Sequence, residues 1–359
     1  MSGRRTLAQR SVKWAALALA ATALLATATG ATGASAATPT ASTPIPTHVY
    51  SPYFESWTTD TLTGVAQASG AKYLTVAFLQ TLSKSSCVLA WNGDNARTTT
   101  TSPTPYLADL TNLRAIGGDI VPSFGGWSAD QGGTEIGDSC SNVDSIAAAY
   151  EHVVTTYGVT RLDMDIEGRS LTNTAGIDRR NQGIAKLQQW ATSTGRTVTV
   201  SYTLPTTRSG LESTGVAILQ NALSHGVRID VVQPMVFDYY DKVTNLSMGQ
   251  SAINAVTGLH SQLASLLGTS KTSAQLWAME GATIMNGLDD YPKKTESTSV
   301  ADAQSLLAFA QANGMSVLSI WAIERDNGGC PGNTGANNCS GIVQNTWDFT
   351  NALKGFTGP

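Results

Sequence analysis

The sequence predicts an α/β fold, a single (β/α)8 TIM barrel. Eight short runs rich in Val, Ile, Tyr, Thr and Leu are each followed by a Gly/Ser/Asn-rich loop and then by a longer segment of helical pattern. Several of these runs are almost continuously apolar, as in a parallel sheet that is covered on both faces. The alternative, a doubly wound dinucleotide-binding domain, lacks a G-x-G-x-x-G motif after the first strand.

Predicted strands and helices alternate along the chain. The strands cover residues 48–54, 73–79, 119–124, 160–167, 197–204, 229–237, 274–281 and 316–322. Apolar residues at helical spacing predict helices over residues 144–157, 177–194, 212–225, 251–267 and 300–313. In the first of these helices Asp144 is the expected N-cap, and Ile146, Tyr150 and Val153 share one apolar face.

The N-terminal residues 1–36 have the features of a secretory signal peptide. Four basic residues precede a largely apolar run from Trp14 to about Ala26, and Ala34-Ser35-Ala36 provides a cleavage signal. The apolar run is shorter than the ~20 residues that span a bilayer. We therefore expect a secreted protein without a membrane anchor in its mature form. Residues 37–47 are expected to form a Pro/Thr-rich linker with nothing apolar enough to pack, and residues 48–359 the barrel.

Charge argues against a polyanionic partner. Only 13% of the residues are charged, and the formal net charge is −4. Loss of residues 1–36 removes four of the 22 basic residues and no acidic one, which leaves 18 against 26 and a charge of −8. The chain has no basic block that could neutralise phosphates, so nucleic acid is excluded as a partner.

Four cysteines in an exported chain predict disulfides, with three possible connectivities. Cys330 and Cys339 lie close together in a Gly/Asn/Pro stretch, and Cys87 and Cys140 lie in two Ser/Gly/Asn-rich segments. The favoured pairing is Cys87 with Cys140 and Cys330 with Cys339. No CxxC spacing exists and the four histidines are scattered, so neither a metal nor a cofactor is expected.

An acidic face on the predicted strand 160–167 is the most informative feature. Asp163, Asp165 and Glu167 alternate with three large apolar residues, so the carboxyl groups share one side of the strand. The apolar side suits the surrounding helices, which leaves the acids pointing into the barrel with Glu167 nearest the C-terminal rim. Burial and mutual repulsion across ~6.6 Å should raise at least one pKa, as a general acid at neutral pH requires.

This pattern resembles the D-x-D-x-E signature of glycoside hydrolase family 18, the chitinase family. Ser123-Phe124-Gly125-Gly126 is similar to the family's S-x-G-G at the end of the third strand. Trp321, at the end of the eighth strand, is similar to the tryptophan that forms the floor of the catalytic subsite. The resemblance covers residues 48–355.

The resemblance implies a role for each acid. Glu167 would protonate the glycosidic oxygen, Asp165 would orient the substrate's 2-acetamido group and stabilise an oxazolinium intermediate, and Asp163 would tune Asp165. The nucleophile would be the substrate's own acetamido oxygen, with retention of the anomeric configuration. The expected partner is chitin or an N-acetylglucosamine oligosaccharide.

The sixth predicted strand departs from the family pattern. Met235 and Asp238 fit its M-x-Y-D motif, but Phe237 replaces the tyrosine whose hydroxyl would hold the acetamido group. Tyr239 has the same facing parity and is predicted to supply the hydroxyl instead.

Three functions remain open at this point. The first is a secreted, monomeric endo-chitinase with an open, shallow groove. The second is an endo-β-N-acetylglucosaminidase, or another hydrolase of N-acetylglucosamine-containing polymers, with the same acidic motif. The third is a chitin-binding barrel with weak or no catalysis, suggested by Phe237. Three tryptophans, Trp57, Trp91 and Trp127, lie in or beside loops after the first three strands and are expected to extend the groove.

Overall fold

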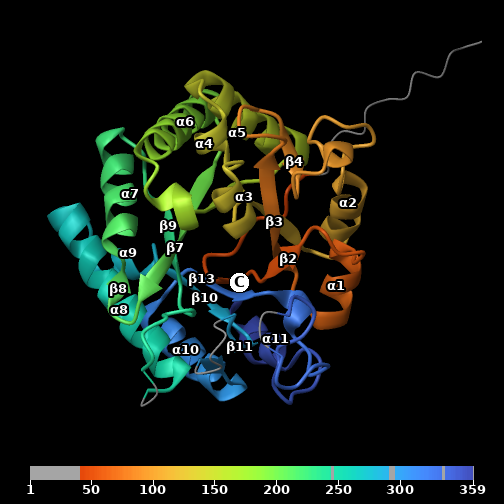
Figure 1. Ribbon diagram of the computed structural model, residues 1–359, viewed down its shortest axis with the longest axis vertical. Helices are drawn as coiled ribbons and strands as arrows, with labels where there is room; N and C mark the ends of the chain where they lie inside the picture. The colour runs from red at the N-terminus through yellow and green to blue at the C-terminus, as the bar shows by residue number, and fades with distance from the viewer. Residues whose placement is uncertain (1–40, 244–245, 291–295, 334–335, 359) are drawn as a thin grey trace, which may run out of the picture. The chain divides into compact units, whose positions relative to one another are not determined.

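Parallel strands form a closed ring inside a ring of helices (Figure 1). The computed structural model describes residues 41–243, 246–290, 296–333 and 336–358. These residues fall within one unit, Pro39–Pro359. The predicted signal peptide and the first residues of the predicted linker lie outside the described residues.

The first strand of the barrel is divided into β1 (Val49–Tyr50) and β2 (Tyr53–Glu55). β1 pairs with the last strand and β2 with the second, which closes the sheet. The other barrel strands are β3 (Tyr73–Thr81), β5 (Asp119–Gly125), β6 (Arg161–Asp165), β7 (Thr199–Thr207), β9 (Val231–Met235), β10 (Gly281–Met285) and β13 (Val317–Trp321). Short antiparallel additions are β4 (Leu89–Trp91), β8 (Gly210–Leu211), β11 (Gly287–Leu288) and β12 (Ser297–Thr298). The predicted barrel is confirmed.

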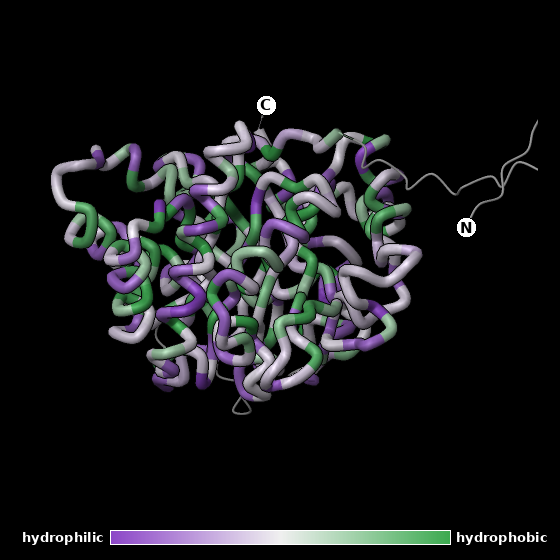
Figure 2. The backbone as a smooth tube through the Cα atoms, turned by 90° about the horizontal axis from the view of Figure 1, so that it is seen from above, coloured by the Kyte–Doolittle hydropathy of each residue, from purple (hydrophilic) through white to green (hydrophobic). Residues whose placement is uncertain are grey.

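The outer layer consists of helices that bury one face against the sheet. They are α1 (Leu62–Ser69), α2 (Leu107–Ala115), α3 (Trp127–Gly132), α4 (Ile136–Ser139), α5 (Val143–Tyr157), α6 (Thr174–Ser193), α7 (Ser213–Ser224), α8 (Met248–Leu267), α9 (Ser273–Trp277), α10 (Val300–Asn313) and α11 (Asp348–Leu353). Along these helices the chain alternates between hydrophobic and hydrophilic residues (Figure 2), as expected for a layer between core and solvent. Short 3-10 helices include η2 (Gly168–Leu171) and η4 (Ile323–Arg325).

Two predictions about local structure are wrong. The seventh strand is not formed by residues 274–281, because Thr272 and Gln275 make a capping box that begins α9, and the strand β10 starts only at Gly281. Helix α5 is capped by Asn142, whose side chain accepts the backbone N–H of Ser145, and not by Asp144.

Part of the predicted linker packs against the barrel. The expectation that it has nothing apolar enough to pack is wrong, because Ile45 contacts a cluster formed by the first residues of four strands. The backbone N–H of Thr43 also donates to Asp119 (2.7 Å). Residues 41–46 nonetheless contain no helix or strand. This segment therefore covers the N-terminal end of the barrel, opposite the predicted site.

Both predicted disulfides are confirmed. Cys87, in the loop after β3, is bonded to Cys140 at the end of α4, and Cys330 is bonded to Cys339 in the long loop between β13 and α11. In the described part of the chain, no helix has the length and apolar character needed to cross a membrane.

Candidate active site

The acidic face of β6 points into the barrel. Asp163 pairs in register with Ser123 of β5 and Ser201 of β7, while Asp165 pairs with Gly125 and Thr203. The alternate residues Leu162, Met164 and Ile166 are buried in the hydrophobic core. Strand alternation therefore places the carboxyl groups as the sequence predicts.

Asp163 lies deepest and is surrounded by hydroxyl donors. Its Oδ1 accepts hydrogen bonds from Ser201 (2.7 Å) and Thr203 (2.8 Å), and its Oδ2 accepts them from Ser123 (2.6 Å) and Tyr53 (3.0 Å). Burial raises the pKa of Asp163, while these hydrogen bonds lower it. Four donors to two oxygens are suited to hold an anion at the base of the site.

Asp165 lacks such donors among the described residues, and the pKa values of Asp165 and Glu167 are also raised. Oδ1 of Asp165 is buried and has no hydrogen-bond partner among the described residues. Burial first, and then the charges of Glu167, Asp163 and Asp130, raise the pKa of Asp165 well above its usual value. Burial raises the pKa of Glu167 to about 7, with Asp238 adding to the rise and the backbone N–H of Trp127 opposing it. This pair can keep a proton at neutral pH.

Two glycines allow β5 to approach the acidic strand. Gly125 has φ +99° and a Cβ atom there would overlap the carbonyl oxygen of Asp165. Gly126, at φ +80°, donates its N–H to that same oxygen (3.0 Å), and a Cβ atom would collide with the Phe78 ring. Only glycine fits at either position.

An aromatic cluster lies beside the acids at the C-terminal end of the barrel. Trp321 is partly exposed and stacks on Phe78, with ring centroids 5.5 Å apart. Its ring also contacts Trp57 (6.3 Å) and the edge of Tyr53 (5.5 Å), which reaches on to Asp163. A partly exposed indole at this position can stack against a sugar ring.

The turn after β9 differs from the sequence prediction. β9 ends at Met235, two residues earlier than expected, and Asp238 and Tyr240 both have positive φ, so strand parity no longer governs direction. The Tyr239 ring lies under the Arg208 guanidinium (4.3 Å), and its hydroxyl is buried without a hydrogen-bond partner among the described residues. Tyr239 as the source of the missing hydroxyl stays a prediction.

Tyr240 is the residue that the sequence reasoning missed. It is 57% exposed, hydrogen-bonds to Asp238, and has a pKa raised by burial first and then by the charges of Asp238 and, more weakly, Glu167. Its side chain therefore interacts with Asp238 in the turn after β9, although the strand pattern gives no signal for it.

Comparison with known proteins identifies the family. The profile described as "Glycosyl hydrolases family 18" matches residues 49–334. The chain belongs to glycoside hydrolase family 18. A probable bifunctional chitinase/lysozyme of Escherichia coli is 31% identical over 300 residues, 80% of this chain and 32% of the relative. Endochitinase 11 of Metarhizium anisopliae is 31% identical over 291 residues, 78% of this chain and 53% of the relative. The chain thus spans about a third and about half of the lengths of these relatives.

Solved family 18 structures agree with the fold. The catalytic domain of a hyperthermophilic chitinase from Pyrococcus furiosus superposes with a TM-score of 0.74 at 27% identity, covering 88% of this chain and 96% of that one. Catalytic site mutants of active domain 2 of the thermostable P. furiosus chitinase, complexed with chito-oligosaccharides, give a TM-score of 0.73 at 26% identity over the same shares.

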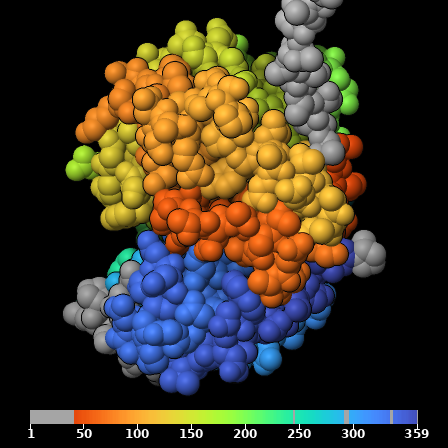
Figure 3. Space-filling view, turned by 90° about the vertical axis from the view of Figure 1, so that its right-hand side faces the viewer, coloured from red at the N-terminus to blue at the C-terminus, as the bar shows by residue number. Residues whose placement is uncertain are grey.

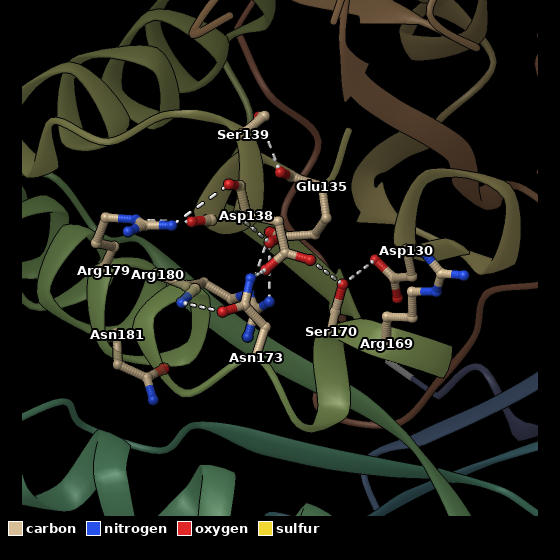
Figure 4. A network of polar contacts seen from close by, with 12 residues as sticks. Asp130, Glu135, Asp138, Ser139, Arg169, Ser170, Asn173, Arg179, Arg180 and Asn181 are labelled. Carbon is tan, nitrogen blue, oxygen red and sulfur yellow. Dashed lines mark hydrogen bonds and ion pairs between the residues drawn. The ribbon is translucent and has the colours of Figure 1, made fainter. Parts of the chain in front are cut away.

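Figure 4 shows a network of polar contacts that includes Asp130 and Asp138, and this network reaches Glu167 through the Asp130 side chain. Asp130 accepts the backbone N–H of Glu167 and the hydroxyl of Ser170 (2.9 Å). The same hydroxyl lies 2.6 Å from a carboxyl oxygen of Asp138. A serine has one hydroxyl hydrogen, so a full hydrogen bond to each of the two carboxyl oxygens is formed when one carboxyl group carries a proton. Burial and the charge of Glu135 raise the pKa values of both aspartates, in accord with such a proton.

A group of acids at the rim has the spacing of a metal site. Oxygens of Asp238, Asp289 and Glu296 lie within 4.8 Å of one another. Backbone N–H groups already donate to Asp289 and Glu296, and Arg208 lies 3.5 Å from Glu296. We assign no metal to this group.

The three tryptophans expected to extend the groove have different surroundings. Trp91 is fully buried and donates its indole N–H to Tyr157 (2.9 Å), so its predicted role in the groove is wrong. Trp127, the first residue of α3, is 60% exposed, and Trp57 is partly buried in the aromatic cluster.

Proposed function

We propose that this chain is a secreted, retaining endo-chitinase that cleaves β-1,4 bonds between N-acetylglucosamine units. The observation that carries the proposal is Glu167, which follows the buried Asp165 by two residues in extended backbone, interacts electrostatically with it and has a pKa raised to about 7. Membership of family 18 and the chitinases named among its relatives support the substrate class.

In the first step, the Glu167 carboxyl group donates its proton to the glycosidic oxygen. The bond between that oxygen and the anomeric carbon breaks, and the leaving sugar keeps the proton as a hydroxyl group. The acetamido oxygen of the same substrate forms a new bond to the anomeric carbon, giving an oxazolinium ion. Asp165 stabilises the positive charge of the oxazolinium ion. Asp163, held by four hydroxyl donors, keeps the electrostatic field at Asp165 constant.

In the second step, a water molecule attacks the anomeric carbon and gives a proton to the Glu167 carboxylate. The bond between the acetamido oxygen and the anomeric carbon breaks. This restores the acetamido group, and Glu167 is again protonated. Two displacements at one carbon retain its configuration. Trp321 supports the sugar from below, and Met235, Asp238 and Tyr239 remain predicted contacts of the acetamido group.

Activity on colloidal chitin tests the proposal. The chain without residues 1–36 should release soluble N-acetylglucosamine oligomers, and Glu167→Gln should lower the rate by about 10²–10⁴. Asp144→Asn is a matched control, because its side chain is 80% exposed and paired only with Lys186 at the surface. Retention on chitin with no release would favour the binding protein. Release only from a high-mannose glycoprotein would favour the endo-β-N-acetylglucosaminidase.

Secretion and cleavage mode need separate measurements. The mass of the exported chain should correspond to removal of residues 1–36, and retention of those residues would contradict the signal peptide. Endo cleavage predicts a fall in the viscosity of a soluble chitin derivative before much reducing sugar appears. Sedimentation should give a monomer.

A further inference from the structure

A cavity opens beside the aromatic cluster that contains Trp57 and Trp321. Its volume is about 1210 Å³, and it lies between the loop after β2 and the loops that follow β13. In Figure 3 the orange surface of the early chain meets the blue surface of the C-terminal loops. Trp57 lines this cavity and also contacts Trp321 (6.3 Å), so the cavity adjoins the aromatic cluster.

Two carboxyl groups face this cavity, that of the buried Glu55 and that of the half-buried Glu324. Glu55 is 1% exposed, and its Oε1 atom has no hydrogen-bond partner among the described residues. Glu324 accepts the backbone N–H of Glu55 at Oε1 (3.0 Å), while its Oε2 atom is also buried and without a partner there. The pair joins residues 269 positions apart in the chain.

No cation lines the cavity to balance these acids. Asp60 adds a third carboxyl group, and the described lining residues include no Lys, Arg or His. Burial first, and then the charge of Glu324, raise the pKa of Glu55 to about 9, with Arg325 opposing the rise and Asp290 and Asp60 adding to it. Burial raises the pKa of Glu324 to about 8.

The lining combines the features of a sugar site with two carboxyl groups, those of Glu55 and Glu324, that face no cation among the described lining residues. Trp57 and Trp347 offer ring faces, and Gln344 and several asparagines offer amide groups. A neutral sugar can satisfy these groups, but it offers Glu55 and Glu324 no positive charge beyond that of the buried Arg325, which already opposes the burial-driven rise in the pKa of Glu55. An ammonium group on the sugar would supply both hydrogen-bond donors and charge.

We propose that this cavity binds a glucosamine unit, a sugar whose 2-amino group is free and protonated. The inference rests on the proposed function, with an acetylated unit on Trp321 and the deacetylated unit beside Glu55 and Glu324. The preferred substrate is then partly deacetylated chitin. When the ammonium group binds, one carboxyl group releases its proton to solvent and becomes the counter-ion, so no other reactant is needed.

Product sequencing tests this preference. Partly deacetylated chitosan is digested with the mature chain, and the products are sequenced by mass spectrometry after end-labelling. A charge-assisted contact predicts about tenfold enrichment of glucosamine at one fixed position from the cleaved bond. Glu324→Gln, at a partly exposed position, and Glu55→Gln should both reduce this enrichment toward none, whereas Asp144→Asn should retain it.

Calorimetry gives a readout that a structural defect would not produce. With Glu167→Gln in the background to prevent cleavage, binding of a glucosamine-containing oligomer at about pH 6 should release up to one proton, measured from the buffer dependence of the heat. Adding Glu324→Gln should lower this release.

The two proposals fail separately. No hydrolysis of a fully acetylated oligomer would overturn the proposed function. Hydrolysis of that oligomer with no glucosamine preference at any position, or a preference unchanged in both glutamine variants, would overturn only the present inference.

Discussion

The proton shared by Asp130 and Asp138 leads to a specific prediction about paired substitutions. Asparagine mimics a protonated aspartate, because it offers one acceptor and one donor end. In Asp130→Asn, the amide oxygen accepts the N–H of Glu167, the amide group donates to Ser170, and Ser170 donates to Asp138. Asp138→Asn is satisfied in the same way from the other end, since Asn173 already donates to its Oδ1 atom (2.9 Å).

The double variant breaks this pattern. Both amide groups then donate to the Ser170 oxygen, and its buried hydroxyl hydrogen loses both acceptors. A buried donor without a partner costs about 1–3 kcal/mol. Each single variant should therefore change the free energy of unfolding by less than about 1 kcal/mol, while the double variant should lose about 1–3 kcal/mol beyond the sum of the two.

The pH dependence of the free energy of unfolding gives a separate test of the same proton. A carboxyl group whose pKa is raised in the folded protein binds a proton on folding, so it costs stability as pH rises above the unfolded pKa. Each single variant removes one such proton and should lower that slope by up to ~1.4 kcal/mol per pH unit as the pH rises above the usual pKa of an aspartate.

Urea unfolding of the four proteins at several pH values measures both quantities. Asp144→Asn is the exposed control and should alter neither. Additive effects of the two substitutions, together with an unchanged pH slope, would refute the assignment of a proton to the Asp130 and Asp138 pair.

Three further predictions concern the acid, the glycine turn and a disulfide. Because Glu167 must be protonated and its pKa is about 7, kcat/KM for a chromogenic chitobioside should fall about tenfold per pH unit above that value, and a flat profile to pH 9 would contradict this role. Gly125→Ala should cost more than about 2 kcal/mol in urea unfolding, whereas Gly195→Ala, with positive φ but open space around it, should cost only about 1 kcal/mol; equal costs would refute the close approach. Replacing Cys87 and Cys140 by alanine should cost about 4 kcal/mol against about 3 for the shorter disulfide, because the loop is longer, and thermal unfolding would reveal the reverse order.

Local periodicity explains which parts of the site the sequence could predict. Side chains alternate strictly along a strand, so Asp163, Asp165 and Glu167 could be assigned to one face without any knowledge of the fold. The same rule does not extend to Tyr239, because β9 ends at Met235 and Asp238 has positive φ, so the proposed role of the Tyr239 hydroxyl stays a prediction. Parity holds while the backbone stays extended, as it does past the end of β6 at Glu167 (φ −134°, ψ −179°).

The sequence by itself predicted the barrel from its repeated strand and helix patterns, and placed Asp163, Asp165 and Glu167 on one face, since both follow from local periodicity. The role of Glu167 as the acid was implied by the resemblance to family 18. Only the tertiary structure decided what surrounds them. It placed Asp130 behind Glu167, buried Trp91 away from the groove, and joined Glu55 to Glu324 across 269 positions of the chain. Such contacts depend on closure of the barrel, which brings the first and last strands side by side, and no local pattern encodes that distance.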